Sequence, residues 1–410
     1  MRSATRPSLV LAIAALLAPA PASAVQARRD PPRPRLETGA DTNDAVAYYN
    51  RGVDLLEHDA QAAANAFFWA TRLDPTWAEA YYARRIAGLM ADSRLLVRYL
   101  NGDRRTEQSA EIQRLDSLEY RAQRINPFFA HDLDKAFFFR YVIASVDQGG
   151  NRPLEGGERM ELEFLIEQAV RSNEVSPWLR AHLAQSQRKY PEALSLFRYA
   201  LSQNRNAVTI HEDLGTLFFA TGAFDSALTH MRAALEELGQ RDADRLVRVY
   251  ESKEGLEYAI GVIHERRGDM AAAREAYGRS LQEDLSYYPA HLRLGLLAFA
   301  GGDTAQALQE LGLAVEVAPA EAPLRVTDGA LLAQVGRTEE AAPQLRKAIE
   351  LEPYYPLPYY LLGRVDELSQ RRAEALADYR AFLARASLRH PRREEVTRRI
   401  ADLEALPPSR

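Results

Sequence analysis

The sequence of 410 residues contains no cysteine. This absence excludes disulfide bonds, thiolate metal ligands, thiol nucleophiles and a lipid anchor on an N-terminal cysteine. The body of the chain also lacks a basic tract, and the formal net charge of -5 argues against a nucleic-acid-binding role. No GxSxG or HExxH motif is present, and the Gly-rich stretch 147–158 lacks the Lys-Ser/Thr of a phosphate loop. The sequence therefore carries no enzyme signature.

Long apolar runs are missing except at the N-terminus. There, two arginines precede an apolar stretch over residues 9–17, and Ala-Ser-Ala at 22–24 offers small side chains at the cleavage positions. This pattern predicts a signal peptide over residues 1–24. An uncleaved anchor is the alternative, although prolines interrupt the stretch and its apolar centre is short for a membrane span. We therefore expect export, to the periplasm or cell envelope of a bacterium.

Glycine recurs at a fixed interval in the second half of the sequence. Four glycines are spaced 34 residues apart: Gly261, Gly295, Gly329 and Gly363. Alanines and bulky residues keep the same interval: Ala273, Ala307, Ala341 and Ala375, then Tyr277, Leu311, Leu345 and Tyr379. A period of this length is typical of units built from two antiparallel helices.

Each of these positions has a physical role in such a unit. The glycine lies in the first helix where the second helix crosses it, because a side chain there would hold the helices apart. The bulky residue lies in the second helix and fills the space between the two. Pro319 and Pro353 cannot continue a helix, so they end the second helix before the next unit. Gly302 and Gly336 are expected to form turns within units.

The pattern "LGLLAFAGGDTAQALQELGLAVEVAP" (294–319) resembles the tetratricopeptide repeat (TPR) family. The resemblance implies an all-α fold, a right-handed superhelical solenoid of TPR-like helical hairpins. It extends upstream to the unit of Gly215, where additional residues near 240–251 predict lengthened helices. It also includes "NRGVDLLEHDAQAAANAFFWATRLDP" (50–75) near the start of the chain.

The resemblance divides the chain into segments. After the signal peptide, the Pro/Arg-rich residues 25–43 are predicted to form a flexible linker. Residues 44–77 are the first TPR-like unit, residues 78–174 are degenerate helical hairpins with insertions, and residues 175–390 are the TPR array. Residues 391–410 are predicted to form a C-terminal capping helix and tail, whose charged outer face meets water.

The stretch "PFFAHDLDKAFFFRY" (127–141) in the degenerate region contains candidate metal ligands. Asn126-Pro127 predicts a helix start, which would place His131 and Asp134 on one face of that helix. Two such ligands hold a metal only with a third from elsewhere. An amphipathic helix with acidic residues near its N-terminal end is the favoured interpretation. We predict no cofactor and no metal.

In TPR proteins the first helix of each unit lines a concave groove, at positions three before, one after and four after the glycine. Carried over by this resemblance, the partner-binding residues are Trp178, His182, Gln185, Glu212, Thr216, Phe219, Tyr258, Val262, Glu265, Leu292, Leu296, Phe299, Val326, Ala330, Ala333, Tyr360, Arg364 and Glu367. The lining is aromatic and aliphatic, which suits an amphipathic helix or an extended peptide with apolar anchors. The alternative for each aromatic residue is packing against neighbouring helices alone. The Lys/Asn set with which some TPR members clamp C-terminal carboxylates is missing.

The resemblance therefore implies an exported TPR scaffold or adaptor without catalytic activity. It would bind a protein or peptide partner in its groove, within a cell-envelope assembly, secretion or polysaccharide-export system. We expect no nucleic-acid partner and no membrane span after signal cleavage. Two alternatives stay open: an enzyme or metal- or ligand-binding protein with its site in residues 78–174, and a self-assembling structural protein.

Overall fold

The computed structural model describes residues 30–100, 103–139, 176–203, 207–244 and 253–407, together with Phe164. Residues 34–410 form one unit of the chain, and the fold is described for this unit. The predicted signal peptide and the Gly-rich stretch 147–158 lie outside the described residues. No helix in the described ranges is long and apolar enough to cross a membrane.

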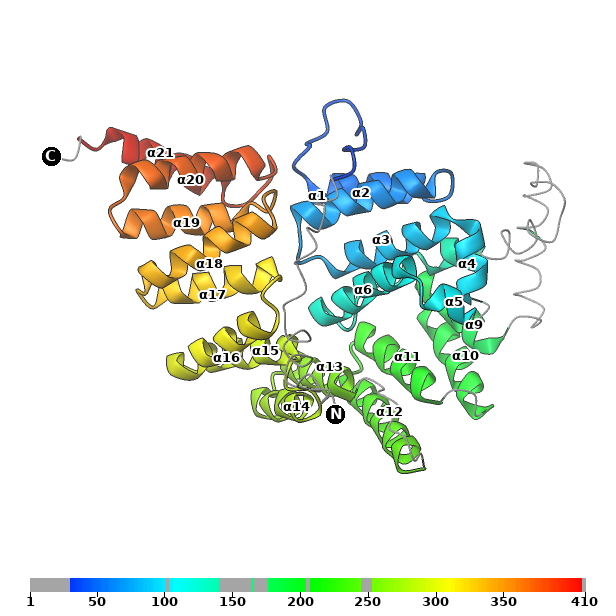
Figure 1. Ribbon diagram of the computed structural model, residues 1–410. Helices are drawn as coiled ribbons and strands as arrows, with labels where there is room; N and C mark the ends of the chain where they lie inside the picture. Colours follow the sequence, from blue (N-terminus) through cyan, green and yellow to red (C-terminus); the bar gives the residue numbers. More distant parts are fainter. Residues whose placement is uncertain are drawn as a thin grey trace, which may run out of the picture. The chain divides into compact units, whose positions relative to one another are not determined.

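The helices pair into antiparallel hairpins, and each hairpin from α9 onward packs on the next (Figure 1). The pairs are α1 (Ala45–Leu55) with α2 (Ala60–Leu73), α3 (Ala78–Ala91) with α6 (Ala110–Ile125), α9 (Pro177–Ser186) with α10 (Tyr190–Ser202), α11 (Ala207–Ala220) with α12 (Phe224–Asp244), α13 (Lys253–Arg267) with α14 (Met270–Glu283), α15 (Tyr288–Ala300) with α16 (Thr304–Val317), α17 (Ala322–Gln334) with α18 (Thr338–Leu351), and α19 (Leu357–Leu368) with α20 (Arg372–Arg385). α21 (Arg393–Ala405) packs on α20. Because the described residues contain no strand and repeat this hairpin, the predicted all-α TPR-like solenoid is confirmed.

The two helices of a hairpin approach each other most closely where a glycine in the first helix faces a bulky side chain in the second. A methyl group added at Gly261 would lie 2.3 Å from Cε1 of Tyr277, and one at Gly363 would lie 2.6 Å from Cδ1 of Tyr379. Atoms in packed interiors do not approach so closely, so a side chain here would force the helices apart. The same arrangement recurs at Gly215 with Met231, Gly295 with Leu311, and Gly329 with Leu345. The predicted role of the periodic glycines is confirmed.

Turns and helix ends follow from local chemistry. Gly302 has a φ of 84° and Gly336 a φ of 83°, a region that side chains with a Cβ rarely adopt. Asp303 then caps α16, because its carboxylate accepts a hydrogen bond from a backbone amide of the first turn. α16 and α18 end before Pro319 and Pro353, as the sequence predicts.

The degenerate region contains a regular hairpin with an insertion. α3 packs against α6, and a methyl group added at Gly88 would lie 2.4 Å from Cδ2 of Leu115. The short helices α4 (Ser93–Leu100) and α5 (Arg104–Glu107) lie between them in the chain. Farther along, α12 has 21 residues whereas its partner α11 has 14, which agrees with the lengthening expected there. The division of the chain into segments stays a prediction.

The stretch 127–141 does not begin as a helix, which corrects the sequence prediction. Asn126 instead ends α6, because its amide bonds to the carbonyl of Ala122 and its side-chain oxygen accepts a hydrogen bond of 3.0 Å from the amide of Phe128. Helical residues start only at Asp134, so His131 precedes the helix. The side chain of Asn126 stabilises a turn here and not a helix start.

Candidate functional site

The predicted groove residues lie on the first helices of successive hairpins, α9, α11, α13, α15, α17 and α19. The structure does not make them equally accessible. Trp178 and Leu296 are exposed, whereas Tyr258, Val262, Val326 and Tyr360 are buried. The half-buried members are His182, Gln185, Glu212, Thr216, Phe219, Glu265, Leu292, Phe299, Ala330, Ala333, Arg364 and Glu367. A partner therefore reaches only part of this set, and the role of each residue in binding stays a prediction.

The middle of the groove is covered by the segment that follows α6. Phe128 stacks on Phe219, with ring centroids 3.9 Å apart and an angle of 14° between the rings. The hydroxyl of Tyr258 donates a hydrogen bond of 3.5 Å to the backbone oxygen of Arg124 and accepts one of 3.5 Å from Arg293. Burial raises the pKa of Tyr258, so its hydroxyl stays protonated. Residues 124–128 thus occupy surface that a ligand of Phe219 and Tyr258 would need.

Two groove carboxylates bond to tyrosines of their own hairpins. Glu265 accepts a hydrogen bond from the hydroxyl of Tyr277, and Glu367 accepts one of 2.6 Å from Tyr379. Burial, together with the neighbouring carboxylate, raises the pKa of each tyrosine. In the two intervening hairpins leucine replaces the tyrosine, and the equivalent groove position carries no acid. These carboxylates therefore stabilise the contact between the two helices of their own hairpins.

At the C-terminal end, α21 covers groove residues of α19. The hydroxyl of Tyr360 donates a hydrogen bond of 3.0 Å to Glu395, and the guanidinium of Arg392 lies 4.7 Å from the centroid of its ring. Arg364 also pairs with Glu395, at 3.7 Å.

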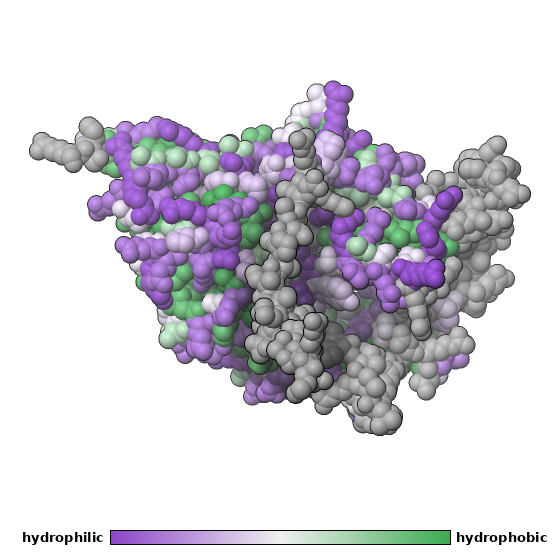
Figure 2. Space-filling model, viewed as in Figure 1, coloured by the Kyte–Doolittle hydropathy of each residue, from purple (hydrophilic) through white to green (hydrophobic). Residues whose placement is uncertain are grey.

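On the face shown in Figure 2, hydrophobic residues over α15–α20 form only small areas between hydrophilic ones.

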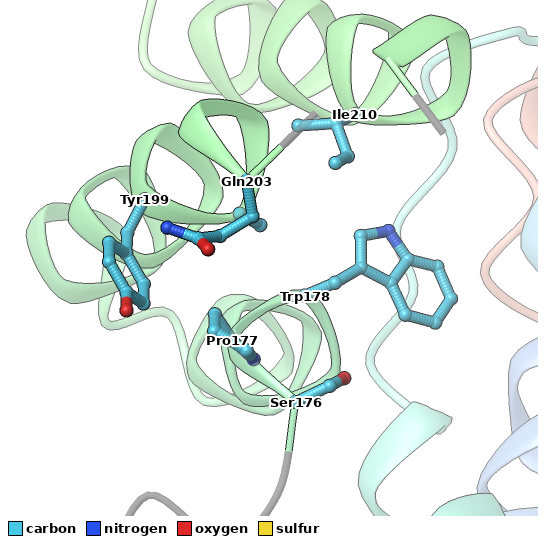
Figure 3. A pocket seen from close by; sticks show the side chains of 7 residues that line it. Ser176, Pro177, Trp178, Tyr199, Gln203 and Ile210 are labelled. Atoms are coloured by element: carbon cyan, nitrogen blue, oxygen red, sulfur yellow. The ribbon is translucent and has the colours of Figure 1, made fainter. Parts of the chain in front are cut away.

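The predicted groove residue Trp178 borders a cavity among α9, α10 and α11. The cavity has a volume of about 460 Å³ and is lined by Ser176, Pro177, Trp178, Tyr199, Ala200, Gln203 and Ile210 (Figure 3). Trp178 is 40% exposed and Tyr199 is 57% exposed, so both rings offer apolar surface to solvent. The indole N–H of Trp178 donates a hydrogen bond of 2.7 Å to Asp213, which restrains the ring. Restrained, accessible aromatic side chains are frequent anchors for protein partners.

Two histidine–aspartate pairs lie in the same region. His182 bonds to Asp213 at 3.2 Å, and His131 lies 3.6 Å from Asp134, which also accepts a hydrogen bond of 2.5 Å from Tyr82. Burial lowers the pKa of each histidine, but the aspartates outweigh it, so both pKa values are raised. The described residues contain no group of three His, Asp or Glu side chains that could hold a metal. His131 and Asp134, the candidates from the sequence, therefore find no third ligand among them.

Sequence reasoning missed two features of this site. Tyr199 and Gln203 lie on or just after the second helix of their hairpin, outside the positions that the family pattern places in the groove. Phe128 lies in the segment after α6, and the repeat pattern does not predict where this segment packs. A tyrosine at a solvent-facing helical position was the signal available for Tyr199.

These features define a class of protein: an all-α array of stacked helical hairpins. Residues 179–245 and 258–323 match the family model described as tetratricopeptide repeat. Together with the repeated glycine crossings, this match identifies tetratricopeptide repeats in these residues and supports a tetratricopeptide repeat protein. Such arrays are scaffolds for protein–protein interaction.

Several solved structures are similar to half of the chain. "Crystal structure of MamA protein" is 21% identical, covers 49% of this chain and 98% of that one, and has a TM-score of 0.36. YrrB, "a TPR protein with an unusual peptide-binding site", is 18% identical, covers 50% and 97%, and has a TM-score of 0.38. A thermophilic TPR protein of Thermus thermophilus, TTC0263, is 25% identical, covers 48% and 100%, and has a TM-score of 0.34. Among curated proteins, no sequence matches the chain.

Proposed function

We propose that the protein is an exported, non-catalytic adaptor that binds a protein or peptide partner at the α9–α11 end of its groove. The observation that carries this proposal is the pair of exposed rings, Trp178 and Tyr199, beside a cavity of about 460 Å³. The middle and the C-terminal end of the groove offer less surface, because residues 124–128 and α21 cover them.

The lining of the cavity suits a peptide with an apolar anchor. Trp178, Tyr199 and Ile210 supply apolar surface, and the amide of Gln203 supplies both a donor and an acceptor for a peptide backbone. An extended segment or one turn of an amphipathic helix satisfies both requirements. The few polar groups then set the orientation of the peptide. The rings of Trp178 and Tyr199, once the peptide covers them, supply most of the affinity.

Photo-crosslinking in cells tests the position of the site. A crosslinking residue at Gln203 should capture a partner, whereas the same residue at Leu388, which is 70% exposed and far along the chain, should not. Trp178→Ala should lower capture at Gln203 about 30-fold, since removal of a central aromatic anchor costs about 2 kcal/mol. Equal capture at both positions, or capture that Trp178→Ala leaves unchanged, would count against the proposal.

The exported location rests on the N-terminal sequence, with its arginines, apolar stretch and small residues at 22–24. We place the adaptor in a cell-envelope assembly, secretion or polysaccharide-export system. A fusion of residues 1–43 to a reporter that is active only outside the cytoplasm tests this location. The fusion should be active and a reporter without these residues inactive; equal inactivity of both would refute export by this segment.

A further inference from the structure

Arg84 on α3 is a half-buried cation without an acidic partner. Its guanidinium lies 4.6 Å from the ring centroid of Phe68 on α2. It forms no hydrogen bond or ion pair with any residue that the structure describes. A cation without a partner in a partly buried position is unfavourable, because burial removes solvent and no opposite charge replaces it.

The acids nearby are already engaged by other arginines. Arg121 pairs with Glu321 at 2.6 Å, and Arg72 pairs with Glu352. Both arginines also lie close enough to raise the local positive potential at Arg84. Burial first, and then the charges of Arg114, Arg121 and Arg72, lower the pKa of Arg84 to about 10.

The geometry leaves donors available for a ligand. A guanidinium stacked on an aromatic ring keeps its N–H groups along the edge, where they match two oxygens of a carboxylate or phosphate. Arg121 adds a further donor, because its Nε is buried and has no acceptor among the described residues.

We propose that Arg84, with Arg121 and Arg72 around it, binds an oxyanion, the carboxylate or phosphate group of a ligand. The site lies where α2, α3 and α6 meet Glu321 before α17 and Glu352 after α18. Its arginines are not among the groove residues, so this inference goes beyond the proposed adaptor function and does not depend on it. A bound oxyanion supplies the opposite charge that Arg84 lacks among the described residues.

Thermal unfolding of the full chain tests the site with simple anions. Sodium phosphate and sodium acetate are each compared with sodium chloride at equal ionic strength. An anion that binds only the folded state raises the unfolding temperature, by about 2–4 °C at concentrations well above its dissociation constant. A shift with phosphate alone identifies a phosphate ligand, and a shift with both identifies a general oxyanion site. The absence of a shift with either anion overturns the proposal.

Two variants separate the site from general salt effects. Arg84→Met keeps the apolar stem but removes the charge, so it should lose the anion-dependent shift and unfold about 2 °C higher than the wild type in chloride. Arg279→Met is the matched control, because Arg279 pairs with Glu257 on a different hairpin, and it should keep the shift. If Arg84→Met does not fold, Arg84→Lys, which cannot bind two oxygens in the same fork, should show a reduced shift. A full shift in the Arg84 variant that folds would refute the site.

Discussion

Two carboxyl groups meet in the last hairpin, where Asp378 on α20 bonds to the buried Asp366 on α19. Asp366 also accepts hydrogen bonds of 2.9 and 2.6 Å from Arg371. Burial, followed by the hydrogen bond and charge of Asp366, raises the pKa of Asp378 to about 7. At mildly acidic pH, Asp378 is therefore protonated in the folded chain and ionised in the unfolded chain.

This pair makes stability depend on pH. Between about pH 4 and pH 7 the folded state keeps a proton that the unfolded state has released, so the free energy of unfolding falls as the pH rises. Asp378→Asn keeps a donor to Asp366 but does not titrate. We expect the variant to exceed the wild type by about 1–2 kcal/mol at pH 8 and to match it near pH 4. Urea unfolding at both pH values measures this difference, and a difference independent of pH would contradict the shared proton.

The tyrosine–glutamate pair of α13 and α14 gives a second test on single residues. Tyr277→Phe should lower the free energy of unfolding by about 1–2 kcal/mol, because the carboxylate of Glu265 loses the hydrogen bond that the hydroxyl of Tyr277 donates. Tyr258→Phe is the control, since both hydrogen bonds of Tyr258 are 3.5 Å long and therefore weak. Denaturant unfolding compares the two variants. Equal losses of stability in the two variants would show that the hydrogen bond to Glu265 contributes no more than the weak bonds of Tyr258.

At the scale of the helices, the distance between the two members of a hairpin depends on single glycines. A methyl group added at Gly261 in α13 would overlap the ring of Tyr277. A methyl group added at Gly278 in α14 would meet no heavy atom within 4 Å. The same residue type thus has opposite roles in the two helices of one hairpin. The first glycine permits the helices to cross, and the second only lowers helix propensity.

Substitution by alanine separates these roles. Gly261→Ala should destabilise the protein by about 1–3 kcal/mol, because the ring of Tyr277 must move out of the crossing. Gly278→Ala should stabilise it by about 0.5–1 kcal/mol, since alanine restricts the unfolded chain and favours the helix. Circular dichroism during urea titration measures both. A loss in Gly278→Ala as large as in Gly261→Ala would contradict the crossing model.

At the scale of the molecule, early hairpins contact late ones. Arg72 pairs with Glu352, and the ring of Trp69 meets that of Tyr354 edge to face at 4.9 Å. Asn43 donates a hydrogen bond of 2.9 Å to the carbonyl of Ala384. In a simple repeat array each unit touches only its neighbours, so units separate in sequence unfold independently. These contacts instead couple residues of the first hairpins to those of the last.

A double-mutant cycle measures this coupling. Arg121→Met and Glu321→Gln each remove one partner of an ion pair whose side chains are 24% and 22% exposed. The sum of the free-energy losses of the two single variants should exceed the loss of the double variant by an interaction energy of about 1–2 kcal/mol. Chemical unfolding supplies the four values. Additive losses would show that the two ends are energetically independent.

The hairpins themselves were predictable from the sequence, because their determinants are local and repeat. Gly261 and its equivalents, the bulky residue opposite each and the prolines after the second helices specify helix pairing without reference to distant residues. Local signals were less reliable at Asn126, which has the chemistry of a helix start but stabilises a turn after α6. The choice between these two roles depends on where Phe128 packs.

The sequence by itself therefore determined the repeat, the hairpin and the candidate groove positions. Only the tertiary structure decided which of those positions a partner can reach: Tyr258 is covered by residues 124–128 and Tyr360 by α21, whereas Trp178 stays open. It also decided that Arg84 has no acidic partner among the described residues, although glutamates lie nearby in space. The physical reason is that accessibility and charge balance depend on contacts between residues far apart in the chain, and a 34-residue pattern contains no information about them.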